Sequence, residues 1–347
     1  MGSVKDLQIL KTPNEKKLGI GRFVYSDRYS VFDWGEMPDQ IRKKGPAITL
    51  LGAYFFEKLE EMGIPTHYVG LVEDDTIKKL SEIKKPTNTM EIKLLRVLKP
   101  LLKGNQYNYS MYNEKNTGIL IPLEVIYRNF LPPGSSVFKR LNIGETNPQE
   151  LGLDRMPIPN QKLVPPILDV STKLEITDRY LTWTEAQKIT MLSNDEIKEL
   201  KNLITIVNDF ITREFSKIGL VNEDGKIEVG FNIKRRLMLV DVLGTLDECR
   251  FTFDGLPVSK EIARIYYRNS DWYQVVEEAK KKDRQNWKKI CRLNPEPLPP
   301  RLNLLISQIY CAVTNEITEN EWFKNVPSLK NILNEIKEIL LERHIVL

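Results

Sequence analysis

Two acidic residues stand where they could face each other across a predicted β-hairpin. Glu228 lies in Asp224-Gly-Lys-Ile-Glu228, and Asp241 follows the next apolar run. With a two-residue loop at 234–235, Glu228 falls directly opposite Asp241, at the roughly 4.5–5.5 Å spacing where like charges repel. Such a pair needs a solvated face, a shared proton or a cation, and Mg²⁺ accepts two carboxylates when it also holds substrate phosphates. The hairpin therefore predicts either a Mg²⁺ site or an ordinary solvated strand face.

A second group of residues has the types needed to hold a phosphate. Arg128 ends the strand-like run Glu124-Val-Ile-Tyr-Arg128, and Gly134-Ser135-Ser136 follows two prolines. A guanidinium, a hydroxyl and backbone N–H groups can bind one phosphate together. A proline-flanked Gly-Ser is also an ordinary turn, so the residues alone leave both interpretations open.

Further polar residues lie in apolar surroundings. Lys226 shares a strand face with Glu228, because side chains alternate with a period of two. Residues 26–33 (Ser-Asp-Arg-Tyr-Ser-Val-Phe-Asp) and Ser171-Thr-Lys173 place charged side chains among strand formers, which indicates a polar site. His67 is predicted to be structural rather than catalytic.

The composition excludes several classes of site. The chain has 347 residues, a formal net charge of +4, three cysteines and two histidines. A histidine-rich metal site is therefore excluded, and a disulfide framework is not indicated, because no CxxC pair occurs and the cysteine count is odd. No Walker A or complete GxGxxG sequence is present, so a nucleotide would need another type of loop. No apolar run approaches the roughly 20 residues of a membrane span.

The elements that must position these residues follow from periodicity and breakers. The pattern predicts strands and turns over 20–35, a helix over 49–62 and a strand over 118–130. Repeated prolines between 132 and 166 predict a long irregular segment that crosses between two lobes. A capping box at Ser193-x-x-Glu196 predicts a long amphipathic helix ending at Gly219. A hairpin is predicted near 226–233 and 236–243.

The remainder is predicted to be helical, near 259–269, 271–282, 300–317 and from about 328 onward. Strands first, then a hairpin and helices, favour an α+β fold in two lobes. We expect an N-terminal lobe over 1–121, a C-terminal lobe over 122–275 and a helical extension over 276–347. The basic run 280–289 is predicted to be a solvated helix face, and on its own it would also allow an RNA-binding protein.

Taken together and in order, these motifs resemble the SAICAR synthase family. Residues 26–33 and Lys44-Gly45 are similar to the family's SDR-x-S-x-FD and KG motifs. Pro122-Leu-Glu-Val-Ile-Tyr-Arg-Asn129 with Gly134-Ser135 is similar to its P-x-E-x-x-x-RN…GS. The order is completed by Ser171-Thr-Lys173, Asp224-x-Lys-x-Glu228, Asp241 and Asp247-x-x-Arg250.

The resemblance implies an activity and a fold. Members of that family are ATP-dependent ligases of purine biosynthesis. They join L-aspartate to the carboxylate of 5-aminoimidazole-4-carboxy ribonucleotide (CAIR) through an acyl phosphate. The resemblance implies a two-lobed α+β fold with a β-rich N-terminal lobe and a mixed α/β C-terminal lobe, here with an extra C-terminal helical extension. The implied cofactors are ATP and Mg²⁺.

Residue roles are also implied by the resemblance, position by position. Glu228 and Asp241 would hold Mg²⁺, and Lys226 would neutralise charge on the transferring phosphoryl group, which makes these three the catalytic residues. The implied ATP-binding residues are Lys5, Glu124 and Lys226. The implied substrate-binding residues are Arg128, Ser135, Lys173, Asp247, Arg250, Lys260 and Arg264. Among these, Arg128, Ser135 and Arg250 would grip the ribotide 5′-phosphate, and Lys260 and Arg264 would border the aspartate. Asp224 would lie by the nucleotide, and Asp33 by a substrate.

The sequence departs from the family pattern near the nucleotide and the metal. The nearest match to the family's GKVRD loop is Gly2-Ser-Val-Lys-Asp6, so Ser3 replaces a lysine and Lys5 an arginine. Val242 stands where many members have a second acid, and Leu246 replaces a proline. The spacing after Arg128 is one residue longer, which makes Ser136 an alternative to Ser135. The alternative function is therefore a divergent ligase or kinase that acts on another ribotide or amine.

We expect a cytoplasmic enzyme whose partners are CAIR, L-aspartate and ATP, without nucleic acid or membrane. A homo-oligomer stays open, because the apolar helix faces near 304–313 and 329–341 need covering by the core or by a second subunit.

Overall fold

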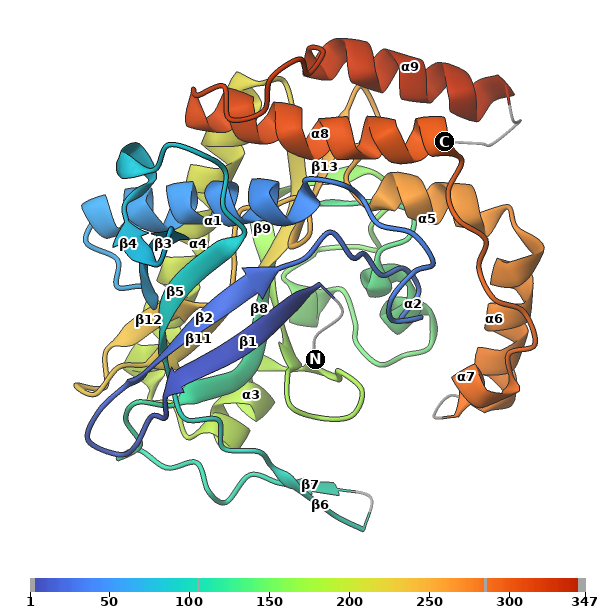
Figure 1. The fold of residues 1–347 in the computed structure, drawn as a ribbon. Coiled ribbons are helices and arrows are strands. Elements are labelled where there is room, and N and C mark those ends of the chain that lie inside the picture. The colour runs from blue at the N-terminus through green and yellow to red at the C-terminus, as the bar shows by residue number, and fades with distance from the viewer. Residues whose placement is uncertain (1–3, 105, 284–285, 343–347) are drawn as a thin grey trace.

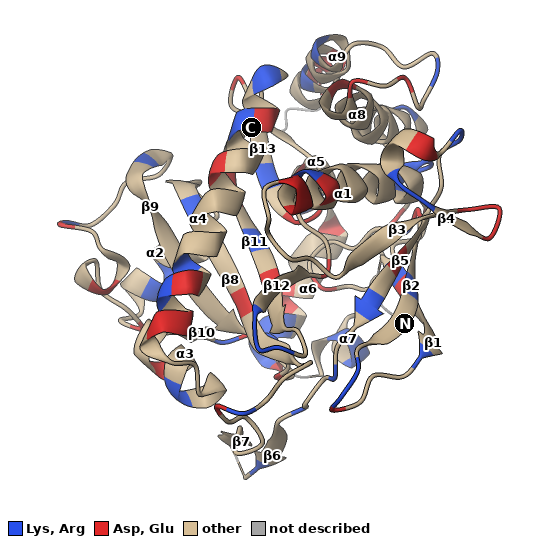
Figure 2. Cartoon of the chain, turned by 90° about the vertical axis from the view of Figure 1, so that its left-hand side faces the viewer, with Lys and Arg blue, Asp and Glu red and all other residues tan. Residues whose placement is uncertain are grey.

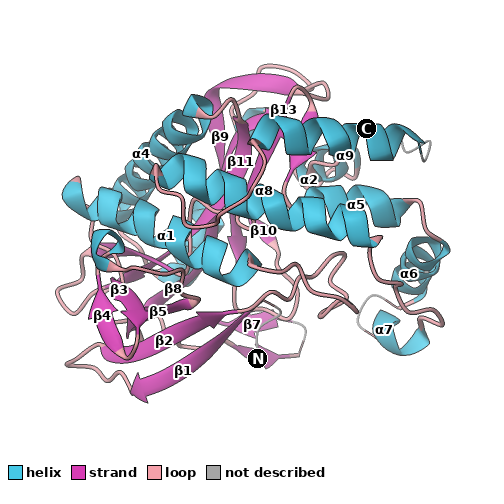
Figure 3. Ribbon diagram, turned by 45° about the horizontal axis from the view of Figure 1, so that its top comes forward, coloured by secondary structure: helices cyan, strands magenta, loops and turns pink. Residues whose placement is uncertain are grey.

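The computed structural model describes residues 4–104, 106–283 and 286–342. Its mixed α+β class agrees with the prediction. Two larger antiparallel sheets lie at an angle to each other and helices pack on their outer faces (Figures 1 and 3). A small third sheet is the hairpin of β6 (Leu101–Lys103) and β7 (Gln106–Asn108), and a 3₁₀ turn, η1, covers Leu80–Glu82. Within these described residues, no helix combines the length and apolar character that a membrane span requires.

The first sheet has the strand order β1-β2-β5-β3-β4. Its strands are β1 (Lys5–Lys11), β2 (Gly19–Tyr25), β3 (Tyr68–Glu73), β4 (Thr76–Lys78) and β5 (Thr89–Leu94). Helix α1 (Lys44–Glu61) packs on β2, β3 and β5. It begins earlier than predicted, because the carboxylate of Asp27 accepts hydrogen bonds from the backbone N–H groups of Lys43 and Gly45 and so holds the first turn.

The prediction of strand structure across 20–35 is wrong beyond Tyr25. Phe32 and Asp33 have φ angles of 54° and 61°, a left-handed conformation that a strand does not allow. Val31 is nevertheless buried, so its apolar character reflects packing of a loop against the core rather than a strand.

The second sheet has the order β10-β9-β8-β11-β13-β14, and β12 also pairs with β11. Its strands are β8 (Leu120–Leu131), β9 (Gln161–Thr172), β10 (Tyr180–Leu181), β11 (Val221–Phe231), β12 (Leu237–Val240), β13 (Cys249–Phe253) and β14 (Leu256–Val258). The predicted long helix is confirmed as α4 (Asn194–Lys217), which starts with the Ser193–Glu196 capping box and packs on β8 and β11. A shorter helix, α3 (Trp183–Thr190), packs against β9.

The proline-rich stretch 132–166 does not cross between lobes, contrary to the prediction. It contains α2 (Ser136–Asn142) and a 3₁₀ turn, η2 (Gln149–Leu151), and it returns as β9 to pair with β8 in the same sheet. The pairing is interrupted between Arg128 and Phe130, where the opposing segment with Pro165 and Pro166 is longer. A bulge at a sheet edge is where prolines are tolerated, because no ladder hydrogen bond is lost there.

Five helices follow β14 in the described part of the chain, and α8 among them packs on α1. They are α5 (Glu261–Arg268), α6 (Asp271–Lys282), α7 (Trp287–Ile290), α8 (Pro300–Thr318) and α9 (Leu329–Glu342). Figure 1 shows α8 lying along α1, with α9 on its outer side. Most apolar side chains of α8 and α9 are buried within the chain itself, while Leu304 and Leu341 stay exposed, so covering these helices does not require a second subunit. Residues 284 and 285 of the basic run 280–289 lie outside the described residues; the rest of the run is not one solvated helix face, since α6 ends at Lys282 and the Trp287 ring is buried.

Backbone hydrogen bonds join the two sheets through β12. On the side away from β11, the N–H of Leu239 donates to the carbonyl of Pro65, and the N–H of His67 donates to the carbonyl of Leu239, both at 2.9 Å. The region that holds Glu228 and Asp241 therefore lies where the sheets meet. The division into 1–121, 122–275 and 276–347 stays a prediction.

Candidate active site

A cleft of about 340 Å³ opens over β8, β11, β13 and the start of α5. It brings together residues that are far apart in the sequence, and Figure 2 shows charges of both signs on β8 and β11. The predicted site residues among its walls are Glu124, Arg128, Asp224, Lys226, Asp247, Arg250, Lys260 and Arg264. Lys5, Lys173, Glu228 and Asp241 form a charged group that Lys226 connects to this cleft.

The predicted register of the hairpin is wrong by one residue. Glu228 pairs with Val240 instead of Asp241. The reason is the turn, which spans 232–236 because the side chain of Asn232 accepts hydrogen bonds from the N–H groups of Lys234 and Arg236. Asp241 then follows the end of β12 in a left-handed conformation, with φ of 64°.

Glu228 and Asp241 nevertheless interact electrostatically. Burial, and then the negative charge of Asp241, raise the pKa of the Glu228 carboxyl above its usual value. Burial alone would raise the pKa of Asp241 as well, but Lys5 and Lys173 outweigh it and lower that pKa. Each carboxylate has a lysine partner, Lys173 for Glu228 and Lys5 for Asp241.

Lys226 lies among three carboxylates. Its Nζ is 2.6 Å from Glu124 Oε1 and 3.5 Å from oxygens of both Glu228 and Glu248. Burial disfavours the charge of Lys226, but Glu248 and Glu124 raise its pKa, so the ammonium stays protonated. This places one fixed positive charge between the cleft and the Glu228–Asp241 pair.

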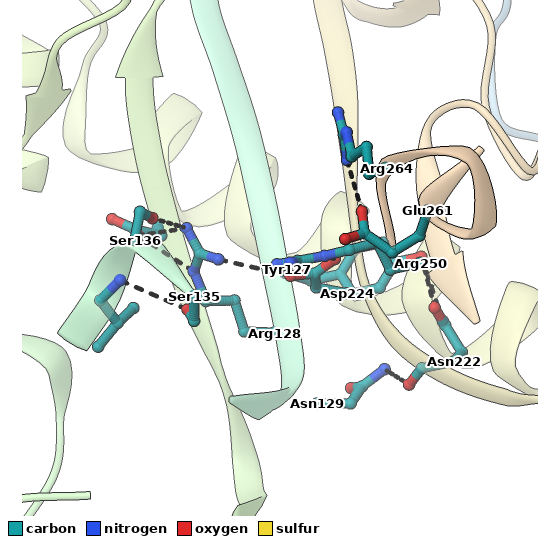
Figure 4. A network of polar contacts seen from close by, with 12 residues as sticks. Tyr127, Arg128, Asn129, Ser135, Ser136, Asn222, Asp224, Arg250, Glu261 and Arg264 are labelled. Atoms are coloured by element: carbon teal, nitrogen blue, oxygen red, sulfur yellow. Dashed lines mark hydrogen bonds and ion pairs between the residues drawn. The ribbon is translucent and has the colours of Figure 1, made fainter. Parts of the chain in front are cut away.

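An arginine network lies next to this Lys226 group in the cleft (Figure 4). The guanidinium of Arg128 donates to Asp169 Oδ2 at 3.1 Å and to Ser136 Oγ at 3.2 Å, and it reaches Asp224 at 3.5 Å. Arg250 Nε donates to Asp224 Oδ1 at 2.7 Å. Asp224 thus holds two arginines side by side, which is a suitable arrangement for a doubly charged phosphate.

Ser135 and Ser136 have different surroundings. Ser135 is buried and caps α2, since its Oγ accepts a hydrogen bond from the N–H of Val137. The Oγ of Ser136 lies 2.8 Å from the hydroxyl of Tyr180 and next to Arg128. The geometry thus favours Ser136 as the phosphate ligand, and the role of Ser135 stays a prediction.

The start of α5 supplies the other cations of the cleft. Lys260 Nζ donates to the backbone carbonyl of Asp247 at 3.0 Å, and Arg264 donates to Glu261 at 2.8 Å. The Asp247 carboxylate is itself almost fully buried, with Lys44 Nζ 2.7 Å from Oδ2. Asp33 lies apart from these residues, with an exposed side chain 3.2 Å from Lys280 Nζ.

Three site residues have no assigned role in the sequence analysis. The sequence did carry a signal for Glu248, because this residue stands inside the Asp247-Glu-Cys-Arg250 motif. Asp169 interrupts the apolar run of β9, and a charged residue on a buried strand is itself a signal of a polar partner. Tyr180 carried no such signal, since its contact with Ser136 depends on how β10 packs.

Comparisons with known proteins identify the family. The family model described as SAICAR synthetase matches residues 2–280. The chain belongs to the SAICAR synthetase family. A relative from Thermoplasma acidophilum, named phosphoribosylaminoimidazole-succinocarboxamide synthase, is 30% identical over 311 residues, which are 86% of this chain and 93% of the relative. A protein of Archaeoglobus fulgidus that bears this name provisionally is 48% identical over 340 residues, which are 98% of this chain and 100% of that one.

Solved structures of SAICAR synthetases share the fold. The enzyme of Saccharomyces cerevisiae, in complex with SAICAR, has a TM-score of 0.57 at 19% identity and is matched over 96% of its length and 90% of this chain. A SAICAR synthetase in complex with ADP has a TM-score of 0.54 at 22% identity, over 99% of its length and 86% of this chain. The predicted two-lobed SAICAR-synthase-like fold is thereby confirmed.

The departures from the SAICAR synthetase pattern have visible consequences in the structure. Val242 is a buried core residue, whose side chain lies against Gly52 of α1. A carboxylate at this position would be buried away from solvent. The carboxylates available as cation ligands are therefore Glu228 and Asp241. Leu246 lines the cleft. Gly2 and Ser3 lie outside the described residues.

Glu223, next to Asp224 on β11, should make the stability of the fold depend on pH. Burial, opposed in part by Arg250, raises its pKa from 4.5 to about 7. Because the folded state holds this proton more tightly, its contribution to stability is present below pH 4.5 and is lost as the pH rises through 7. We therefore expect Glu223→Gln to raise the free energy of unfolding at pH 8 by about 1–3 kcal/mol, and to change it little at pH 4.5.

Urea unfolding of the variant and the wild type at both pH values measures this effect. Glu114→Gln, at an exposed position, is the matched control and should change neither value. An equal effect of Glu223→Gln at pH 4.5 and 8 would contradict the titration of Glu223.

Proposed function

We propose that this chain is an ATP-dependent ligase that joins the amine of L-aspartate to the carboxylate of CAIR, yielding SAICAR, ADP and phosphate. The observation that carries the proposal is the arrangement of the cleft. A two-arginine group around Asp224 and a carboxylate–lysine group around Lys226 line one 340 Å³ space, two residues apart along β11. The arginines suit a ribotide phosphate, and the carboxylate–lysine group suits the ATP phosphates with their cation.

The chemistry follows from the charge of the substrate. A carboxylate resists attack by an amine because it is anionic. Transfer of the γ-phosphoryl group breaks the bond between the γ-phosphorus and its bridging oxygen, forms a bond to a carboxylate oxygen and releases ADP. The aspartate nitrogen then attacks the carbonyl carbon, phosphate leaves with the former carboxylate oxygen, and the amine proton passes to solvent.

The residues of the chain contribute positions and charges to these steps. Lys226 supplies a cation where negative charge moves between ATP and the carboxylate. Arg128 and Arg250 would fix the ribotide by its phosphate, so that its carboxylate is presented at the Lys226 end. Lys260 and Arg264, near the start of α5, have the positive charge needed to bind the two carboxylates of aspartate.

The donor set at Glu228 and Asp241 fits Mg²⁺. Both donors are carboxylates; Glu228 is buried, and the side chain of Asp241 is 19% exposed. Among the described residues, no group of three or more His, Cys, Asp or Glu side chains could hold a metal, so other ligands would have to complete the shell. Magnesium commonly binds one or two protein carboxylates and completes its shell with water and phosphate oxygens. When bound it would shield the charge of the ATP phosphates. We expect a cytoplasmic location, where nucleotides are made; a homo-oligomer stays a prediction.

The test is ADP release in the presence of Mg-ATP, CAIR and L-aspartate, with each component omitted in turn and the product identified by mass. ADP formation that requires all three, with a succinocarboxamide product, is the expected result. Preference for another amine would indicate a divergent ligase, and ADP formation without any amine would indicate a kinase. Silence with CAIR would contradict the proposal.

Substitution can distinguish the roles of Ser135 and Ser136. We expect Ser136→Ala to raise the KM for CAIR by roughly 3- to 10-fold, because it removes a hydroxyl beside Arg128. Ser135→Ala should instead cost about 1 kcal/mol of stability through loss of the α2 cap, with little change in KM. Steady-state kinetics and thermal unfolding of both variants measure these effects. The reverse pattern would return the phosphate role to Ser135.

A further inference from the structure

Helix α8 contributes a side chain to the loop beneath the cleft. The hydroxyl of Tyr310 donates a hydrogen bond to Asp247 Oδ1 at 2.6 Å. Tyr310 is 2% exposed and lies beyond residues 2–280, which the family model matches. The contact therefore joins the C-terminal helices directly to a residue of the candidate active site.

The Asp247 carboxylate is held from two sides. Lys44, at the start of α1, forms an ion pair with Oδ2 at 2.7 Å, and its ammonium lies 5.8 Å from the ring centroid of Tyr310. Burial alone would raise the pKa of Asp247, but Lys44, Lys260 and the Tyr310 hydrogen bond lower it to about 2. The buried group is thus an anion that needs each of its donors.

The loop that carries Asp247 positions two cations of the cleft. Its backbone carbonyl accepts a hydrogen bond from Lys260 Nζ at 3.0 Å. The next residue, Glu248, has a carboxylate 3.5 Å from Lys226 Nζ, and its carbonyl accepts from the Lys226 N–H at 3.3 Å. A shift of the Asp247 side chain would therefore move Lys260, on the substrate side, and Glu248, which contacts Lys226 on the phosphoryl-transfer side.

We propose that Tyr310 is a positioning residue of the active site, which acts through Asp247 to fix the loop that orients Lys260 and Glu248. The inference rests on the proposed function. It gives α8 a role in the reaction in addition to packing on α1. Tyr310 itself is buried behind Asp247 and does not line the cleft.

The variant Tyr310→Phe removes one hydroxyl and keeps the ring. We expect a rise of about tenfold in the KM for L-aspartate, because the loop that orders Lys260 loses a charge-assisted hydrogen bond. The KM for ATP should stay within about twofold. Thr314→Val is the matched control, since Thr314 lies one turn further on α8 and is equally buried. Its hydroxyl bonds to the backbone carbonyls of Tyr310 and Ala47, so the substitution leaves the Tyr310 hydroxyl and its bond to Asp247 in place. It should leave both constants unchanged.

A double-mutant cycle tests whether Tyr310 acts through Asp247. In an Asp247→Asn background, Tyr310→Phe should change the KM for L-aspartate less than twofold. Full additivity in the cycle, or equal effects of Tyr310→Phe and Thr314→Val, would overturn the inference. If Asp247→Asn does not fold, the comparison of Tyr310→Phe with Thr314→Val decides. A wild type that is silent with CAIR overturns the proposed function and the inference with it. An active wild type with an unchanged Tyr310→Phe variant overturns the inference alone.

Discussion

Replacing Glu228 by glutamine should reduce turnover by about a thousandfold or more, with the fold intact. Glutamine has the shape of glutamate, but it lacks the charge that Mg²⁺ and its bound phosphates require. A loss of several kcal/mol of transition-state stabilisation corresponds to this factor. The measurement is ADP release over a range of Mg²⁺ concentrations, together with the midpoint of thermal unfolding.

Asp241→Asn should give the same loss. Asparagine tolerates the left-handed backbone that Asp241 adopts, so the substitution removes charge without adding strain. The matched control for Glu228→Gln is Glu73→Gln. Glu73 is 4% exposed, as Glu228 is, and it also pairs with a lysine, Lys78, but it lies in the first sheet. If Glu228→Gln keeps a near-normal rate, the metal assignment is wrong.

Lys226→Met should lower kcat by about 10²- to 10³-fold. The substitution keeps most of the side-chain volume but removes the ammonium that lies close to Glu124, Glu228 and Glu248 together. Charge that develops during phosphoryl transfer then lacks its counter-charge, and three carboxylates are left to repel the ATP phosphates. Single-turnover measurements separate this effect from binding, since the rate of the chemical step should fall more than the affinity for ADP.

Lys78→Met is the control for that experiment. Lys78 also pairs with a buried glutamate and has 26% side-chain exposure, against 30% for Lys226. It should affect stability without affecting kcat per folded molecule. Equal loss of rate in both variants would mean that the effect comes from folding and not from the charge at Lys226.

Much of the fold follows from local pattern. The amphipathic period and capping box predicted α4, and the alternation along 118–130 predicted β8. Proline misled the prediction between 132 and 166, because it signals broken hydrogen bonding but cannot tell a loop from a bulged edge strand. Hydrophobicity misled it at Val31, because a buried loop residue and a strand residue are equally apolar.

The sequence by itself determined the family and the chemical types of the site, because the order of short motifs around Arg128, Lys226 and Glu228 survives without knowledge of the fold. Tertiary structure decided how these residues meet. Asn232 set the hairpin turn and so moved Glu228 opposite Val240. The hydrogen bond from Tyr310 to Asp247 joins residues 63 positions apart. Local periodicity predicts which face of an element is buried. Only the packing of distant elements determines which side chains contact that face.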